Sequence, residues 1–349
     1  MGTVLSVRVW DSALPRVTPL PPSSMPPSVE PEPGVDASPR RRAARIIDDV
    51  FGVVSRWEDR LSTWRQATPL SRLRRSAAGT PVPLTRPVVD ALFEVRRWSA
   101  ATSGAFDPTV GALIDAWDLR GSGRVPSNEQ LARARGLSGW ANFRLDGTRR
   151  SVTRTTDSAW IDSGAFGKGL ALRAALDTLR ALGVDRAILD FGGQVVLLGA
   201  PPNAERSWRV SVARPDARLA RALGLCLRGD QSVATSAASG RVVTVGGGGP
   251  RLGHVVDPRT GRPVHAWGSV TVVTSDPLSA DVLATALFVM GADQALAWAE
   301  AHPGVGVLVI EAPPVEAASI SAPHDIPMLR WSASLASSIV IDSTAAMVR

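Results

Sequence analysis

The stretch SAWIDSGAFGKGLALRAALDTLRALG, residues 158–183, has the pattern of a strand, a glycine turn and a helix that stops at Gly183. The turn carries Lys168, the only lysine in a chain with 39 Lys and Arg residues and no tyrosine. A glycine turn that opens a helix presents unpaired N–H groups and a positive dipole end, and both favour a phosphate. We therefore interpret Lys168 as a phosphate-facing cation, the alternative being a tight turn with a solvated lysine.

Two familiar phosphate-binding motifs do not match this turn. A Walker A loop needs a glycine five residues before Gly167 and a hydroxyl after the lysine, where this chain has Asp162 and Gly169. A dinucleotide fingerprint needs G-x-G-x-x-G, and the glycines at 164, 167 and 169 give that spacing in reverse order. Neither motif therefore identifies the turn, and both interpretations of Lys168 stay open at this point.

The composition is that of an ordinary globular protein with a basic excess. Of 349 residues, 44% are hydrophobic and 20% charged, and the formal net charge is +7. A basic chain can bind nucleic acid or an anionic membrane, but these arginines are spread along the sequence, so we attribute the excess to compositional drift. The lone Cys226 excludes an internal disulfide and a cysteine-based zinc site.

The N-terminus shows no leader. Met1 directly precedes the alternating segment TVLSVRVW at 3–10, and no stretch reaches the 18 or so uncharged apolar residues of a membrane span. This pattern predicts a cytoplasmic protein without a signal peptide, lipobox or stable membrane span. An extracytoplasmic protein is expected instead if the true start lies upstream.

Proline and hydrophobic spacing divide the chain. Residues 11–40 hold nine prolines, and we interpret them as a flexible insertion into one domain formed by 1–10 and 41–335, with a C-terminal tail at 336–349. Hydrophobic spacing predicts helices at 41–61, 87–101, 168–182 and 279–290. Strand-like runs lie at 3–10, 151–156, 186–191, 195–200, 207–213, 241–245, 268–274 and 304–310. Because several strands succeed one another without a helix, the pattern favours an α+β fold.

Two further segments carry side chains suited to chemistry. SADVLATALFVMG at 279–291 places Asp281 and Thr285 on one helical face, and hard oxygen ligands of this kind suit Mg²⁺. Asp281 could instead only complement the helix dipole. In GHVVDPRTGRPV at 253–264, His254 ends an apolar strand, where it could act as a general base or bond to backbone.

Together these segments resemble one family, the ApbE-type FAD:protein FMN transferases. The resemblance covers nearly the whole chain outside the insertion. It rests on MGTVLSVRVW (1–10), LSTWRQATPLSRL (61–73), SGAFDPTVGALIDAW (103–117), IDSGAFGKGLA (161–171), LDFGGQVVLLG (189–199), SVATS (232–236), HVVDPRTGRPV (254–264) and SADVLATALFVMG (279–291). It implies an α+β fold with mixed, largely antiparallel sheets packed with helices.

The resemblance also implies a reaction and a site. Such enzymes cleave FAD at its pyrophosphate with Mg²⁺, transfer FMN to a Thr or Ser hydroxyl of an acceptor protein, and release AMP. By the same resemblance the Mg²⁺ ligands are Asp281, Thr285 and the carbonyl of Ala165, and the candidate catalytic residues are Asp281 and His254, the latter as base. The implied FAD contacts are Met1, Trp64, Ala105, Phe106, Asp107, Asp162, Lys168, His254 and Val255.

These assignments carry one geometric requirement and leave two alternatives open. The carboxylate of Asp281 must lie near the turn that carries Lys168. An FAD-binding protein or FAD pyrophosphatase on the same fold would need no acceptor, and a basic nucleic-acid-binding protein would bind its partner in a strongly salt-dependent way. We expect FAD and an acceptor protein as partners, and no nucleic acid. Trp64, where tyrosine is usual, and Gln194, where aspartate is usual, depart from the family pattern.

Overall fold

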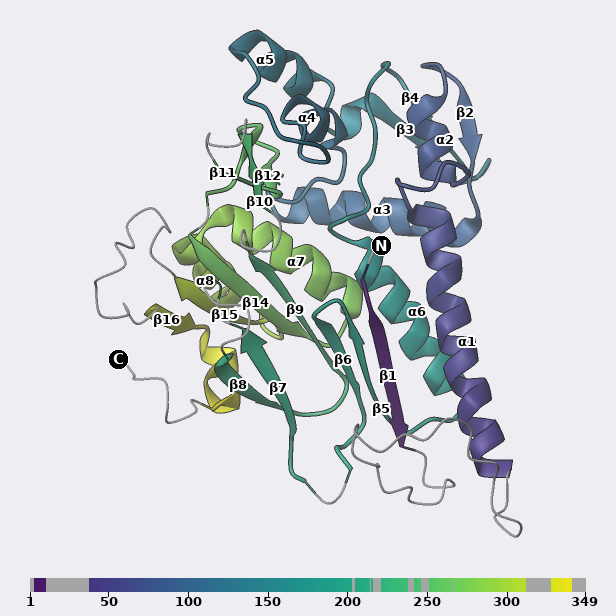
Figure 1. Cartoon of the computed structure of the whole chain (residues 1–349), viewed down its shortest axis with the longest axis vertical. Coiled ribbons are helices and arrows are strands. Elements are labelled where there is room, and N and C mark those ends of the chain that lie inside the picture. The colour runs from purple at the N-terminus through teal and green to yellow at the C-terminus, as the bar shows by residue number, and fades with distance from the viewer. Residues whose placement is uncertain are drawn as a thin grey trace.

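A seven-stranded sheet organises the chain (Figure 1). The structure is a computed structural model that describes residues 3–10, 38–202, 205–213, 215, 221–237, 242–245, 251–265, 267–311 and 328–340. Met1 and residues 11–37 of the predicted insertion lie outside these ranges. The sheet has the order β1 (Leu5–Trp10), β5 (Arg186–Phe191), β6 (Gln194–Leu198), β9 (Gln231–Ala237), β14 (Gly268–Thr274), β15 (Gly306–Glu311) and β16 (Met328–Trp331). Every pairing within it is antiparallel.

Both faces of this sheet are covered, so all seven residues of β14 are buried. On one face, α6 (Gly167–Ala181) packs against β5 and β6, and α7 (Pro277–Met290) packs against β9 and β14. α1 (Ser38–Leu61) lies along α6, and α8 (Ala292–Glu300) contacts α7 and β15. On the other face lies a small sheet of β7 (Trp208–Ala213), β8 (Arg221–Leu227) and β17 (Ile339–Val340), joined to the large sheet by a shared apolar cluster.

The remaining elements gather at one end of the molecule, above α6 and α7 in Figure 1. They include α2 (Pro69–Arg75), α3 (Arg86–Ala101), α4 (Gly111–Ala116) and α5 (Asn128–Gly136). A three-stranded sheet there consists of β2 (Pro81–Pro83), β4 (Ser151–Arg154) and β3 (Phe143–Asp146). Two hairpins complete this end, β10 (Val242–Thr244) with β11 (Arg251–Gly253) and β12 (Val256–Asp257) with β13 (Arg262–Pro263).

The α+β fold and the four predicted helices are confirmed. Gly183 ends α6 as expected, because its φ of +73° lets its N–H reach the carbonyl of Arg180 and lets Val184 reach that of Leu179. The strand predicted at 158–162 is wrong, since this segment pairs with no sheet and the N–H of Asp162 bonds to the carbonyl of Pro108 at 2.7 Å. Residues 336–340 of the predicted tail include β17, which pairs with β8.

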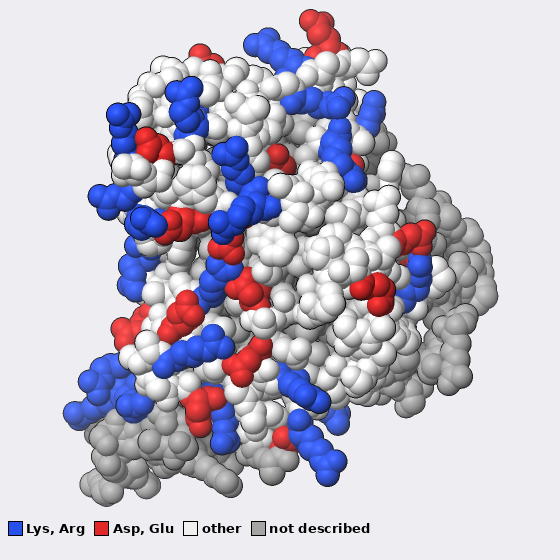
Figure 2. Space-filling view, turned by 180° about the vertical axis from the view of Figure 1, so that it is seen from behind, with Lys and Arg blue, Asp and Glu red and all other residues white. Residues whose placement is uncertain are grey.

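Two features bear on the membrane and nucleic-acid alternatives: the length and hydropathy of the described helices, and the charges on the face shown in Figure 2. Among the described residues, no helix combines the length and the apolar character that crossing a bilayer requires. The face in Figure 2 shows Arg side chains interspersed with Asp and Glu. On this face the two signs of charge are therefore interspersed, whereas a nucleic-acid-binding surface gathers one sign.

Candidate active site

The start of α6 brings Lys168 against the carboxylate of Asp281. The Nζ atom of Lys168 lies 2.6 Å from Oδ1 of Asp281, and the N–H of Gly169 donates to Oδ2 at 2.8 Å. Asp281 is only 4% exposed, so its buried charge is compensated by an ammonium and a backbone amide. The two side chains are 113 residues apart in sequence. Their contact meets the geometric requirement stated for the metal assignment.

Hydroxyl groups extend this site along α7. Thr285 lies one turn after Asp281 and donates to its carbonyl oxygen at 3.4 Å. The Oγ of Ser236, on the neighbouring strand β9, lies 3.4 Å from the Oγ1 of Thr285. The site therefore combines one carboxylate, one ammonium and two hydroxyls at the N-terminus of α6, where Asp281 already accepts from the N–H of Gly169.

Gly169 allows α6 and α7 to approach closely enough for this contact. A Cβ atom at position 169 would lie 2.6 Å from the carbonyl oxygen of Pro277 and 2.9 Å from the Cβ of Asp281. The first of these neighbours is backbone and cannot rotate away. The absence of a side chain at Gly169 thus sets the distance between the two helices at the site.

We expect Gly169→Ala to lower the free energy of unfolding by about 2 kcal/mol, because the added methyl forces the two helices apart. Urea denaturation followed by circular dichroism measures this change. Gly136→Ala is the matched control, since a Cβ at this helical position meets nothing within 4 Å. The control should unfold at an equal or higher urea concentration. Equal midpoints for the two variants would contradict the close-packing argument.

Arg173, on α6, holds the residue that precedes α7. Its guanidinium donates to both carboxylate oxygens of Asp276, each at 2.6 Å, and to both oxygens of Glu94 on α3, at 2.8 and 2.9 Å. Asp276 in turn caps α7 by accepting from the N–H of Ser279. Burial raises the pKa of Asp276, but the hydrogen bonds from Arg173 and Ser279 outweigh burial and lower it overall. This ion triad ties α3, α6 and α7 together, and sequence reasoning missed it because its members belong to no motif.

A second cluster joins two predicted FAD contacts through Arg120, which sequence reasoning also missed. Nη2 of Arg120 donates to Oδ1 of Asp162 and to Oγ1 of Thr63, both at 2.7 Å. Its Cζ lies 4.5 Å from the ring centroids of both Trp64 and Trp160. Trp64 is 61% exposed, whereas Trp160 is buried. The structure therefore brings Trp64 and Asp162 together around one guanidinium.

The predicted contacts at 105–107 lie next to Asp162. Ala105 and Phe106, backbone included, are each 1% exposed and belong to the core, so the structure offers neither of them to a ligand at the surface. Asp107 accepts hydrogen bonds from the N–H and the Oγ1 of Thr109 at 2.8 and 2.7 Å. Burial raises the pKa of Asp107, and these two hydrogen bonds offset only part of the effect.

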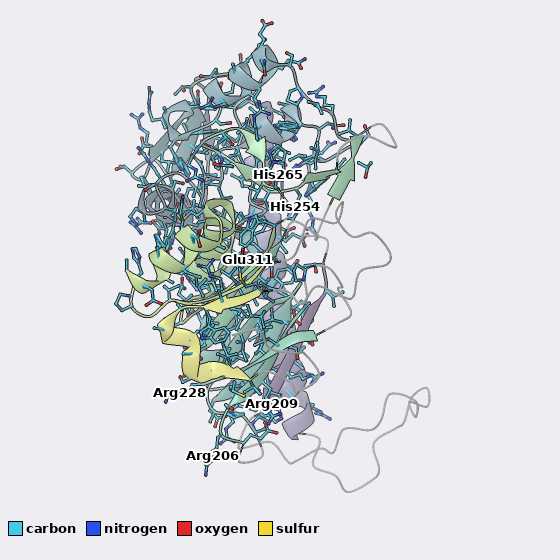
Figure 3. The ribbon with its side chains drawn as sticks, turned by 90° about the vertical axis from the view of Figure 1, so that its left-hand side faces the viewer. Arg206, Arg209, Arg228, His254, His265 and Glu311 are labelled. Carbon is cyan, nitrogen blue, oxygen red and sulfur yellow. The ribbon has the colours of Figure 1, made fainter. Side chains whose placement is uncertain are left out.

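His254 lies on a hairpin beside α7. It occupies the bend between β11 and β12 and is exposed, and Figure 3 shows it on the same side of the molecule as His265. The carbonyl of the adjacent Val255 accepts from the N–H of Val264 at 2.8 Å. Val255 also packs against both apolar clusters that contain residues of α7. The backbone at His254 is thereby held near the helix that carries Asp281.

The donor atoms at Asp281 suit a hard divalent cation. Within the described ranges, no three His, Cys, Asp or Glu side chains are grouped to hold a metal. Mg²⁺ does not need such a group, since it is bound by one or two carboxylates and keeps positions for water and phosphate. Asp281 supplies one such carboxylate, and Thr285 supplies a hydroxyl one turn later on the same helix. The residues present therefore fit Mg²⁺.

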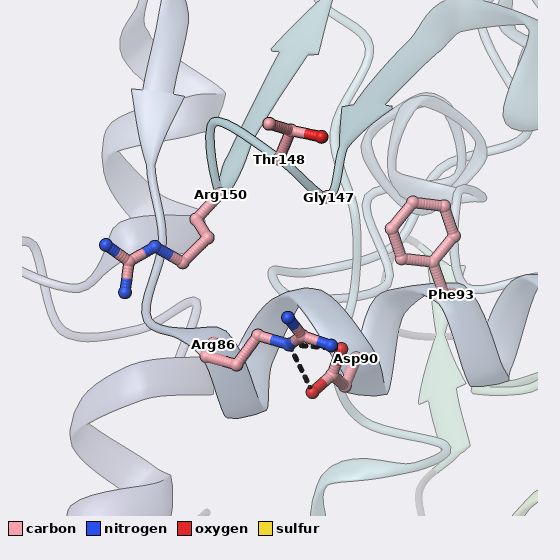
Figure 4. A pocket seen from close by; sticks show the side chains of 6 residues that line it. All are labelled: Arg86, Asp90, Phe93, Gly147, Thr148 and Arg150. Atoms are coloured by element: carbon pink, nitrogen blue, oxygen red, sulfur yellow. Dashed lines mark hydrogen bonds and ion pairs between the residues drawn. The ribbon is translucent and has the colours of Figure 1, made fainter.

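A separate depression of about 720 Å³ lies between α3 and the β3–β4 turn (Figure 4). Arg86, Asp90, Phe93, Gly147, Thr148 and Arg150 line it. The charge of Asp90 is already met by Arg86, whose Nε donates to both of its oxygens at 2.8 and 2.9 Å. None of the predicted site residues lines this depression, and it plays no part in the site.

Comparison with known proteins finds one family throughout. The ApbE family model matches residues 1–309. The FAD:protein FMN transferase of Treponema pallidum is 30% identical over 290 residues, which cover 78% of this chain and 79% of that protein. The FAD:protein FMN transferase of Vibrio cholerae is 29% identical over 262 residues, covering 74% and 75%. The apo crystal structure of the Pseudomonas stutzeri flavinyl transferase ApbE superposes with a TM-score of 0.70 at 26% identity, covering 84% of this chain and 87% of that one.

Proposed function

The chain belongs to the ApbE family, and from this premise we propose that it transfers FMN from FAD to a Thr or Ser hydroxyl of an acceptor protein, releasing AMP in a Mg²⁺-dependent reaction. The observation that carries the proposal is the contact of Lys168 with Asp281 at the start of α6. A cation, a helix N-terminus and a hard oxygen ligand meet there; the first two favour a phosphate, and the third favours the Mg²⁺ that accompanies one.

In the proposed reaction, the acceptor hydroxyl oxygen bonds to the phosphorus of the FMN half. The bond from that phosphorus to the bridging oxygen breaks, and AMP leaves with the bridging oxygen. His254 is the candidate base that takes the hydroxyl proton. Lys168 would hold a phosphate oxygen through its ammonium. Asp281, Thr285 and the Ala165 carbonyl would hold Mg²⁺, which when bound neutralises charge on the phosphates.

The FAD contacts are proposed on the second cluster and its neighbours. Trp64 offers an exposed ring for stacking, and Asp162 and Asp107 offer polar contacts. Contacts are also proposed at Ala105 and Phe106, which FAD could reach only if the residues that cover them move, and at Val255, which joins His254 to β12. The contact proposed at Met1 lies outside the described residues.

Asp107→Asn should raise the melting temperature of the protein and, if Asp107 contacts FAD, weaken FAD binding. The amide oxygen can still accept both hydrogen bonds from Thr109, while the cost of burying a charge disappears. Because the pKa of Asp107 is raised, its ionisation costs stability as the pH rises through and above its unfolded value. We expect the variant to melt at a higher temperature than wild type at pH 7 and at about the same temperature in acid. FAD should bind about tenfold more weakly if Asp107 contacts it.

The proposed function is tested by mixing the protein with FAD, MgCl₂ and a threonine-containing acceptor peptide. Mass spectrometry should detect FMN attached to the peptide, and chromatography should detect AMP in equal amount. AMP and free FMN without labelled peptide, for every peptide and candidate protein tried, would favour the FAD pyrophosphatase. Salt-sensitive binding of a DNA oligonucleotide without binding of FAD would favour the nucleic-acid-binding alternative.

A further inference from the structure

We propose that Arg120 is a positioning residue for FAD: it holds the indole of Trp64 as a stacking surface for an aromatic ring of FAD and ties that surface to Asp162. This inference rests on the proposed function and deepens it. No motif in the sequence marks Arg120, which lies in the turn after α4. Its role follows from what the guanidinium contacts.

The backbone of Trp64 is held by hydrogen bonds that do not involve Arg120. Oγ of the buried Ser62 accepts from the N–H groups of Trp64 and Arg65, both at 3.2 Å. This bracing fixes the position of the Cα atom but leaves the side chain with its own rotamers. Trp64 as a whole is 61% exposed, and the Cζ atom of Arg120 lies over its ring, 4.5 Å from the ring centroid. A large aromatic held at the surface in this way is suited to stacking on a ligand ring.

The guanidinium itself is held on several sides. Nη2 donates to Asp162 and Thr63, and the plane also stacks on the buried ring of Trp160. The side chains of Arg120 and Asp162 are 19% and 22% exposed, so this pair is more constrained than an ordinary surface ion pair. Moving Arg120 would release the ring of Trp64 and the carboxylate of Asp162 together.

Arg74 supplies a matched control within the same cluster. Its Cζ lies 4.2 Å from the ring of Trp160, and its Nη2 pairs with Asp115 at 3.0 Å. It therefore makes the same two kinds of contact as Arg120, on different partners. A variant at Arg74 disturbs the stack on Trp160 while leaving the contacts between Arg120, Trp64 and Asp162 in place.

The test compares Arg120→Gln, Arg120→Lys and Arg74→Gln for FAD binding, measured by flavin fluorescence anisotropy. We expect the dissociation constant for FAD to rise about tenfold in Arg120→Gln and to change less than about twofold in Arg74→Gln. Arg120→Lys should not restore binding, because lysine keeps the charge but not the planar stack. In steady-state transfer, KM for FAD should rise while kcat at saturating FAD falls less than about threefold, since Arg120 is not placed at the phosphates.

A double-mutant cycle with Trp64→Leu shows whether Arg120 acts through the ring. We expect Trp64→Leu and Arg120→Gln each to weaken FAD binding, and the double variant to bind FAD more tightly than the product of the two factors predicts, with any remaining loss reflecting Asp162. Titrations with FMN and with ADP identify which half of FAD carries the stacked ring, because only that half should lose affinity in Arg120→Gln. Circular dichroism and the melting temperature establish that each variant is folded.

The inference would be overturned by unchanged FAD affinity in folded Arg120→Gln, by multiplicative effects in the double variant, or by an equal loss in Arg74→Gln. Restored affinity in Arg120→Lys would overturn the stacking argument and with it the inference. A wild-type protein that binds FAD and labels an acceptor, combined with any of these results, leaves the proposed function standing. A wild-type protein that does not bind FAD overturns both.

Discussion

Asp281→Asn is expected to reduce FMN transfer by at least about a thousandfold while the protein stays folded. The amide oxygen of asparagine can still accept the N–H of Gly169, so α6 and α7 keep their contact. What disappears is the negative charge that binds a divalent cation and attracts the ammonium of Lys168. Transfer is measured by the mass of the labelled acceptor, and Mn²⁺ binding by electron paramagnetic resonance.

Asp177→Asn is the control for this change, because Asp177 is an exposed carboxylate on α6 that makes no contact with the site residues described here. It should transfer FMN at the wild-type rate and bind Mn²⁺ as wild type does. Full transfer by Asp281→Asn would remove Asp281 from the metal site. Lost transfer with normal Mn²⁺ affinity would instead assign Asp281 to the positioning of Lys168.

Local sequence patterns predicted the positions of the helices better than they predicted which elements pack or pair together. The spacing of apolar residues placed α1, α3, α6 and α7 correctly, because each helix buries one face or is buried on all sides. Phe51, however, is 44% exposed although it follows the helical repeat of α1. The extended segment at 158–162 looked like a strand because its residues are apolar, but its Asp162 amide is satisfied by the Pro108 carbonyl.

The candidate site was predicted in the parts that motifs carry. Lys168, Asp281 and Thr285 each lie in a recognisable stretch, so their approach across 113 residues could be expected from the resemblance. Arg120 and Arg173 could not be expected in this way. Each is one arginine in an arginine-rich chain, and its partners, Asp162 and Trp64 for one and Glu94 and Asp276 for the other, are defined only by tertiary packing.

The Lys168–Asp281 pair also places two functions in competition. In the proposed site Asp281 would offer its carboxylate to a metal, yet its Oδ1 lies 2.6 Å from the ammonium of Lys168. A divalent cation and this ammonium repel each other, so each weakens the binding of the other at the carboxylate. A pyrophosphate that attracts Lys168 away would relieve the conflict. FAD and Mg²⁺ should therefore bind more tightly together than either binds alone.

Lys168→Met is therefore expected to move two measurements in opposite directions. FMN transfer should fall by on the order of several hundredfold, because a charged contact to the phosphates is lost. Mg²⁺ affinity without FAD should rise about tenfold, since the competing ammonium is gone, and the gain in metal affinity on adding FAD should shrink. The variant should melt at a lower temperature than wild type without metal, and its melting temperature should rise more than that of wild type when MgCl₂ is added.

Isothermal titration calorimetry and thermal melts measure these effects, with Lys168→Arg as the variant that keeps the charge. Weaker Mg²⁺ binding in Lys168→Met would contradict the competition, because it would make the ammonium a support for the metal site rather than its rival.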